Sequence, residues 1–128
     1  MSVTPRKRTA HFRWSRTVFE KAILDALNEI PAALANAVEN VEFIINDAPA
    51  KPGSKNFLLG LYQGVPLNER GLFYQNALPD TITLYRANIE RTAKNRNELV
   101  GTIRDTIIHE VAHYFGMNDR EIRKRGFG

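Results

Sequence analysis

The sequence contains no cysteine, and this absence removes several kinds of site. Disulfides, thiolate zinc ligands, iron–sulfur clusters and a cysteine nucleophile are all excluded. Long apolar runs are missing as well. The longest, Phe57–Tyr62, contains a glycine and is far shorter than the ~20 residues that cross a bilayer. We therefore expect no interaction with membranes.

The N-terminus also lacks the pattern of a secretory signal. Its basic residues are not followed by the apolar segment that a signal peptide needs. An Arg-rich start without acidic residues is compatible with an organelle transit peptide, but the sequence shows no amphipathic helix there. We expect a cytoplasmic protein.

What is present is the composition of an ordinary globular domain. Of the 128 residues, 43% are hydrophobic and 25% are charged, which is typical of a folded chain rather than a disordered one. A chain of this length forms one domain, and its hydrophobic core is large enough to be stable without disulfides or a structural metal ion.

The net charge of +4 is unevenly distributed. Residues 1–16 include five basic and no acidic residues, and residues 120–128 include four basic residues and one acidic residue. We interpret 1–16 as a basic, flexible arm and 17–128 as a single domain. Basic ends can bind nucleic acid through its phosphates. Solubilising tails are the simpler interpretation, so nucleic acid is not the expected partner.

Helical and strand periodicities alternate along the first two thirds of the chain. Thr17 and Glu20 have the spacing of a capping box, and apolar residues then recur at helical spacing. Pro31 either ends this helix or begins a short second one. Alternating or apolar stretches predict strands in three segments: 41–45, 57–62 and 81–85.

A second long helix is predicted from Asn95, which can cap it with Glu98 at the third helical position. Gly116 is placed to end this helix in the left-handed conformation. An apolar row at i+4 spacing runs through its middle: Leu99, Ile103, Ile107 and Val111. The sequence therefore predicts an α+β fold, in which a small three- to four-stranded mixed sheet packs against the two helices.

The second helix carries a possible metal site. His109 and His113 are four residues apart, so both lie on one face of the helix and their ring nitrogens can converge on one zinc ion. Glu110 lies about 100° further round the helix. It is badly placed to chelate, but it can reach a water bound to the metal, as a general base does.

A catalytic zinc site needs three protein ligands and one open position. Gly116 and Asp119 extend the motif to HExxHxxGxxD, in which the glycine permits a sharp turn and Asp119 can return to the metal as third ligand. Asn118 and Asp119 can instead cap a short following helix. Three other residues remain alternative ligands: Asp105, His11 and Asp80.

Three strings give the chain a family resemblance: LLGLYQGVPL (58–67), LPDTITLYR (78–86) and HEVAHYFGMND (109–119). Over residues 17–124 it resembles the zincin-like metallopeptidase type 1 family, small bacterial proteins also called minimal zincins. The resemblance implies a compact zincin core that binds Zn²⁺. It implies His109, His113 and Asp119 as metal ligands and Glu110 as the catalytic carboxylate.

The sequence departs from the larger metzincins in two ways. Their third ligand is usually histidine, and they have a methionine-containing turn after the motif, for which the residues following Asp119 supply no methionine. A carboxylate ligand lowers the positive charge of the site. We therefore expect it to depress the pKa of bound water less than a third imidazole does.

Several further residues are candidates for supporting roles. Asp105 lies one turn before His109 and can orient its imidazole, or it can pair with Arg104 at the surface. Tyr85 can donate a hydrogen bond to a developing oxyanion, whereas Tyr114 is better explained by packing. If the strand at 81–85 lies at a sheet edge, an extended peptide can pair with it.

These observations predict a zinc-dependent metallopeptidase that hydrolyses a peptide or protein substrate with Glu110 as general base. Two alternatives remain open. The chain can be a metal-binding module without catalytic activity, or a basic nucleic-acid-binding protein in which the metal is structural.

Overall fold

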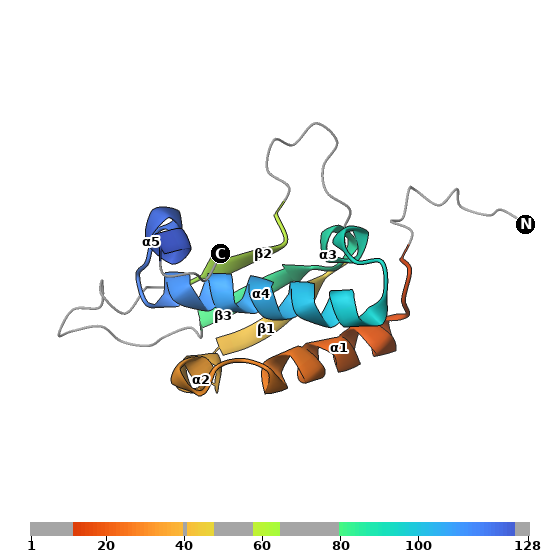
Figure 1. Ribbon diagram of the computed structural model, residues 1–128, viewed down its shortest axis with the longest axis horizontal. Coiled ribbons are helices and arrows are strands. Elements are labelled where there is room, and N and C mark those ends of the chain that lie inside the picture. Colours follow the sequence, from red (N-terminus) through yellow and green to blue (C-terminus); the bar gives the residue numbers. More distant parts are fainter. Residues whose placement is uncertain (1–11, 40, 48–57, 65–79, 125–128) are drawn as a thin grey trace, which may run out of the picture.

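The structure, a computed structural model, describes residues 12–39, 41–47, 58–64 and 80–124 (Figure 1). Its elements in chain order are α1 (Arg16–Asn28), α2 (Ala32–Glu39), β1 (Val41–Asn46), β2 (Gly60–Gln63), β3 (Asp80–Tyr85), α3 (Arg86–Thr92), α4 (Arg96–Tyr114) and α5 (Asp119–Lys124). In this described part of the chain, no helix combines the length and apolar character needed to span a membrane.

The strands form one mixed sheet in the order β1-β3-β2. β1 runs parallel to β3, with Phe43 opposite Ile82, and β2 runs antiparallel to β3, with Tyr62 opposite Ile82. The predicted α+β fold with a small mixed sheet is confirmed. The edge position considered for the strand at 81–85 is wrong, because β3 is the central strand and both of its edges are occupied.

Two helices cover one face of this sheet. Figure 1 shows α4 lying across the sheet with α1 beside it, and α3 and α5 near opposite ends of α4. The apolar row predicted for α4 is fully buried in the core, and so are Ile82 and Leu84 of β3. Since side chains alternate along a strand, Thr83 and Tyr85 lie on the opposite face of the sheet from α4.

The caps of the two long helices show where the sequence patterns succeed and fail. In α4, the Asn95 side chain accepts a hydrogen bond from the backbone N–H of Glu98 at 2.9 Å, as predicted. In α1, however, the cap is Ser15, whose hydroxyl accepts from Val18 N–H at 3.2 Å. The predicted capping box at Thr17 is therefore wrong by two residues, because a hydroxyl two positions earlier satisfies the free N–H groups first.

The end of the predicted N-terminal arm packs on the domain. Arg16 already belongs to α1. The backbone N–H of Arg13 donates to Glu90 Oε1 at 2.6 Å, and Arg86 donates to the carbonyl of Trp14 at 2.7 Å. The Phe12 ring lies over the Arg86 guanidinium, 3.7 Å from the ring centroid. The boundary at residue 16 is thus too late on the described residues, and residues 1–11 of the arm lie outside them.

α3 was not predicted from the sequence. Its seven residues have no apolar periodicity, and two of its charged side chains, Arg86 and Glu90, are buried. They form an ion pair with 3.2 Å between Arg86 Nε and Glu90 Oε2. Helix α3 is therefore stabilised by tertiary contacts: the ion pair itself, and the hydrogen bonds of Arg86 and Glu90 with the chain segment before α1.

Candidate metal centre

The last turns of α4 bring three potential metal donors together. Atoms from the side chains of His109, Glu110 and His113 all lie within 4.8 Å of one another. The two imidazole rings stack edge to face with centroids 5.1 Å apart. The burial of the opposite, apolar side of α4 in the core fixes which way these three side chains point. The expected convergence of His109 and His113 is present in the structure.

The turn after α4 orients His113. Gly116 has φ 84°, a left-handed conformation that glycine adopts without strain. Its N–H donates to His113 O at 2.8 Å and Met117 N–H donates to Ala112 O at 3.1 Å, which together make a Schellman motif. Helix α4 therefore ends where the sequence predicted.

The turn after α4 also places a backbone carbonyl beside the imidazole of His113. Its Nδ1 lies 3.0 Å from the carbonyl oxygen of Met117. A carbonyl only accepts, so Nδ1 carries the proton in this bond. In the neutral ring the lone pair is then on Nε2, which makes Nε2 the nitrogen that can bind a metal. Carbonyl partners of this kind hold many metal-binding histidines in position.

Glu110 is held from the sheet. Its side chain is only 10% exposed, and Oε1 accepts a hydrogen bond from the backbone N–H of Tyr62 at 2.8 Å. The second oxygen, Oε2, lies 4.0 Å from His109 Nε2. That distance is too long for a direct hydrogen bond and is compatible with a small group between the two atoms. One oxygen is thus anchored and the other faces the histidines.

The anchor depends on close contact between β2 and α4. A Cβ at Gly60 would lie 2.6 Å from Thr106 Cγ2 and 3.3 Å from Glu110 Cγ. Any larger residue at this position would push the strand away from the helix. Sequence reasoning missed both Gly60 and the Tyr62 N–H. The available signal was a glycine inside a strand pattern, which often marks a close backbone approach.

The donor set fits zinc. Zinc binds imidazole nitrogens and carboxylate oxygens, and two of the three ligands of a catalytic site are present as a pair one helical turn apart. His109 retains 32% exposure of its side chain, so the cluster is open to solvent on one side. A third ligand is still needed, and the sequence candidate for it is Asp119.

Asp119 is the first residue of α5, and its side chain is outside the described part of the structure. The capping role that competed with metal binding is taken by its neighbour. Asn118 Oδ1 accepts from Glu121 N–H at 2.9 Å, and the Glu121 carboxylate accepts from Asn118 N–H at 3.3 Å. This reciprocal capping box begins α5 without Asp119. Asp119 as third ligand stays a prediction.

The other sequence candidates lie elsewhere. Asp105, 69% exposed, accepts from Arg104 Nε at 3.0 Å, which is the surface pairing considered above. Hydrogen bonds with Asp105 and with Glu29 raise the pKa of Arg104 above its ordinary value. Tyr85 is separated from the histidines by the sheet, since it lies on the face opposite α4. Tyr114 is buried against Tyr62 with centroids 6.1 Å apart, as expected for packing.

The two remaining alternative ligands are distinguished by their positions. Asp80 is buried at the start of β3 and accepts a hydrogen bond from the Tyr62 hydroxyl at 3.2 Å. It is not a member of the donor cluster formed by the described residues. His11 lies outside the residues that the structure describes.

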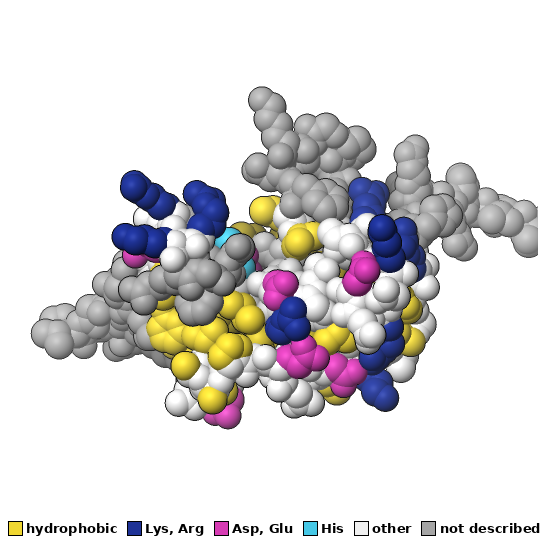
Figure 2. All heavy atoms as spheres, viewed as in Figure 1, with side chains coloured by type: hydrophobic (Ala, Val, Ile, Leu, Met, Phe, Trp, Pro, Cys, Tyr) yellow, Lys and Arg dark blue, Asp and Glu magenta, His cyan; other side chains and the backbone are white. Residues whose placement is uncertain are grey.

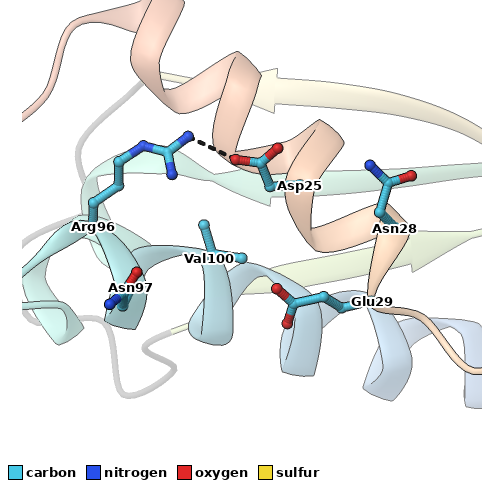
Figure 3. A pocket seen from close by; sticks show the side chains of 6 residues that line it. All are labelled: Asp25, Asn28, Glu29, Arg96, Asn97 and Val100. Carbon is cyan, nitrogen blue, oxygen red and sulfur yellow. Dashed lines mark hydrogen bonds and ion pairs between the residues drawn. The ribbon is translucent and has the colours of Figure 1, made fainter.

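A separate hollow of about 500 Å³ lies between α1 and the beginning of α4 (Figure 3). The ion pair between Arg96 and Asp25, 2.8 Å apart, crosses it, and Val100 lines it. Arg96 precedes His109 by 13 residues, or about 20 Å along the helix axis. This hollow is therefore distinct from the donor cluster.

Comparison with known proteins supports the assignment that the motif suggests. A model of the zincin-like metallopeptidase family matches residues 38–127, which include β1 to α5 and the donor cluster. The chain belongs to the zincin-like metallopeptidase family. No curated protein sequence matches this zincin-like chain.

A solved structure shares the fold of this zincin-like protein. It is a conserved hypothetical protein from Thermus thermophilus, with a TM-score of 0.56 and 19% sequence identity. The match covers 80% of the present chain and 94% of the other. At this identity the similarity establishes the fold and nothing about activity.

The close contact at Gly60 gives a testable prediction. We expect Gly60→Ala to lower the free energy of unfolding by about 1–3 kcal/mol, the usual cost of overpacking, because Thr106 Cγ2 occupies the space. Adding Thr106→Ser should restore part of the loss. Serine lacks Cγ2 but keeps the hydroxyl that Thr106 donates to the Thr102 carbonyl at 2.7 Å. Urea unfolding of both single variants and the double variant measures the coupling. Strictly additive effects would contradict the packing argument.

Proposed function

We propose that this zincin-like protein is a zinc-dependent peptidase. The observation that carries the proposal is that backbone groups hold the side chains of both His113 and Glu110 in position. The Met117 carbonyl lies beside His113 Nδ1 and so leaves Nε2 as the nitrogen for a metal, and the Tyr62 N–H holds Glu110 beside the histidines. A structural metal site needs the histidines but has no use for a carboxylate kept beside them with one oxygen anchored.

His109, His113 and Asp119 would hold the zinc, which makes a set of two neutral ligands and one anionic ligand. When bound, zinc lowers the pKa of a coordinated water and polarises a carbonyl group. Glu110 would accept a proton from the attacking water through Oε2, since Oε1 is occupied by Tyr62 N–H. The same carboxyl group would then deliver the proton to the leaving amine.

The sheet offers a place for an extended substrate next to Glu110. Leu59 O accepts from Tyr85 N–H at 2.9 Å, so odd-numbered residues of β2 face β3. Gly60 and Tyr62 therefore point their backbone groups to the outer edge, where Tyr62 N–H meets Glu110. We propose that a short or unfolded peptide lies along this side of β2, in place of the β3 pairing considered from the sequence.

Metal removal and restoration test the proposal. We expect the zinc-loaded protein to cleave an unfolded polypeptide such as casein, to lose this activity on dialysis against dipicolinate, and to regain it with one equivalent of zinc. Magnesium should not restore it, because magnesium prefers an all-oxygen shell. The mass of the products identifies the cleaved bonds. Cleavage that persists after the metal has been removed would contradict the proposal.

A further inference from the structure

Three cations lie together on α5, immediately after the donor cluster. Arg120, Arg123 and Lys124 are all exposed. Arg123 and Lys124 follow Arg120 by three and four residues, so both side chains are neighbours of Arg120 on the helix surface. We call this group the α5 cation face. Figure 2 shows its side chains gathered beside the histidine surface of the molecule.

The acidic residues of α5 offset the charge of this face only in part. The carboxylate of Glu121 keeps its negative charge but is directed to the backbone N–H of Asn118, at the start of the helix. Asp119 is assigned to the metal by the proposed function. Among the described residues, no ion pair joins a carboxylate to Arg120, Arg123 or Lys124, whereas other arginines of the chain are paired: Arg16, Arg86, Arg96 and Arg104.

The α5 cation face is close enough to influence a substrate at the donor cluster. Met117 O contacts the His113 ring at 3.0 Å, and Arg120 follows Met117 by three residues, which span at most about 11 Å. This is comparable to the Debye length of about 8 Å at physiological salt. Charges at such a distance act on a bound chain without touching the reacting bond.

We propose that the α5 cation face selects substrates with acidic side chains beside the cleaved bond. The inference rests on the proposed function and names its substrate class. An acidic polypeptide fits better than nucleic acid. A nucleic-acid groove follows the backbone with a continuous basic surface, whereas this group covers one face of a six-residue helix. In Figure 2 the described surface next to it is mainly apolar or uncharged, and acidic and basic side chains are mixed further away.

The experiment measures binding rather than cleavage. The zinc-loaded Glu110→Gln variant is titrated with three peptides of one design that differ at four positions, which hold Glu, Gln or Lys, and each carries a neutral dye. Fluorescence anisotropy gives the Kd. We expect the Glu peptide to bind roughly tenfold more tightly than the Gln peptide, the sum of several modest surface interactions. The Lys peptide should bind most weakly.

Two further measurements locate the effect. Replacing Arg120, Arg123 and Lys124 together with Gln should make the Glu and Gln peptides bind equally. A matched control replaces three other exposed cations, Lys21, Arg91 and Lys94, with Gln and should keep the preference. Raising the ionic strength from about 0.01 to about 1 M, which shortens the Debye length from about 30 to about 3 Å, should abolish the preference without any substitution on α5.

The outcomes are distinct. Equal binding of the Glu and Gln peptides at low salt overturns the inference, and so does an equal loss of preference in the control variant, which would indicate net charge alone. Tighter binding of an oligonucleotide of matched charge, lost with the α5 cations, would assign the face to nucleic acid instead. The proposed function fails separately, if the wild-type protein cleaves none of the peptides.

Discussion

Glu110→Gln is expected to lower kcat/KM for peptide hydrolysis at least ~100-fold, the usual contribution of a general base, while zinc remains bound. Glutamine has the same shape, and its carbonyl oxygen can still accept the hydrogen bond that Tyr62 N–H now donates to Oε1 at 2.8 Å. The amide that replaces Oε2 cannot take a proton from water. The variant therefore loses the chemistry while keeping the packing of a side chain that is nearly buried.

Zinc content and kinetics are measured on the same sample of this variant. Glu42→Gln, the same change at an exposed position of β1, serves as the control and should leave both unchanged. Loss of zinc in Glu110→Gln would make Glu110 a ligand and contradict the assigned role. Unchanged hydrolysis would place the chemistry elsewhere.

Glu90→Gln is expected to cost about 3–5 kcal/mol of unfolding free energy, the range for breaking a buried ion pair. Both partners are buried, and Arg86 would keep its charge with only the partly exposed Asp47, 3.3 Å away, as counterion. The glutamine carbonyl oxygen can still accept the backbone N–H groups of Arg13 and Trp14, which both donate to Oε1, so the expected loss comes from the ion pair at Oε2.

Urea unfolding measures the Glu90 effect, and a surface pair provides the comparison. Asp25→Asn breaks the ion pair with Arg96, whose side chains are 38% and 41% exposed, and should cost less than about 1 kcal/mol. If both variants lose the same small amount, the Arg86–Glu90 pair does not hold the N-terminal segment as described.

The parts predictable from the sequence are those with a local cause. α4 was located by the Asn95 cap, its apolar row and Gly116, because each signal acts within a few residues. The same holds for the convergence of His109 and His113, which follows from one helical turn. The strands β1 and β3 were found by alternation. Asp119 as third ligand remains a prediction from spacing.

The parts not predictable depend on contacts between distant residues. Tyr62 and Glu110 are separated by 48 residues, and no periodicity in either segment indicates that one anchors the other. α3 has no amphipathic pattern from which it could be predicted, because a buried ion pair and contacts with the chain before α1 stabilise it. The order of the strands, which makes β3 central and β2 the neighbour of Glu110, is likewise set by packing.

The most direct test of the central claim, that α4 and the turn after it hold one zinc ion, is a titration of the metal-free protein with zinc against a competing chelator. We predict one equivalent per wild-type chain and markedly weaker binding in Asp119→Asn, with a modest change in stability because Asn118 caps α5. Asp119→His should retain zinc. Failure of the wild-type protein to take up zinc near pH 7.5 would contradict the account, and unaltered affinity in Asp119→Asn would remove Asp119 from the ligand set.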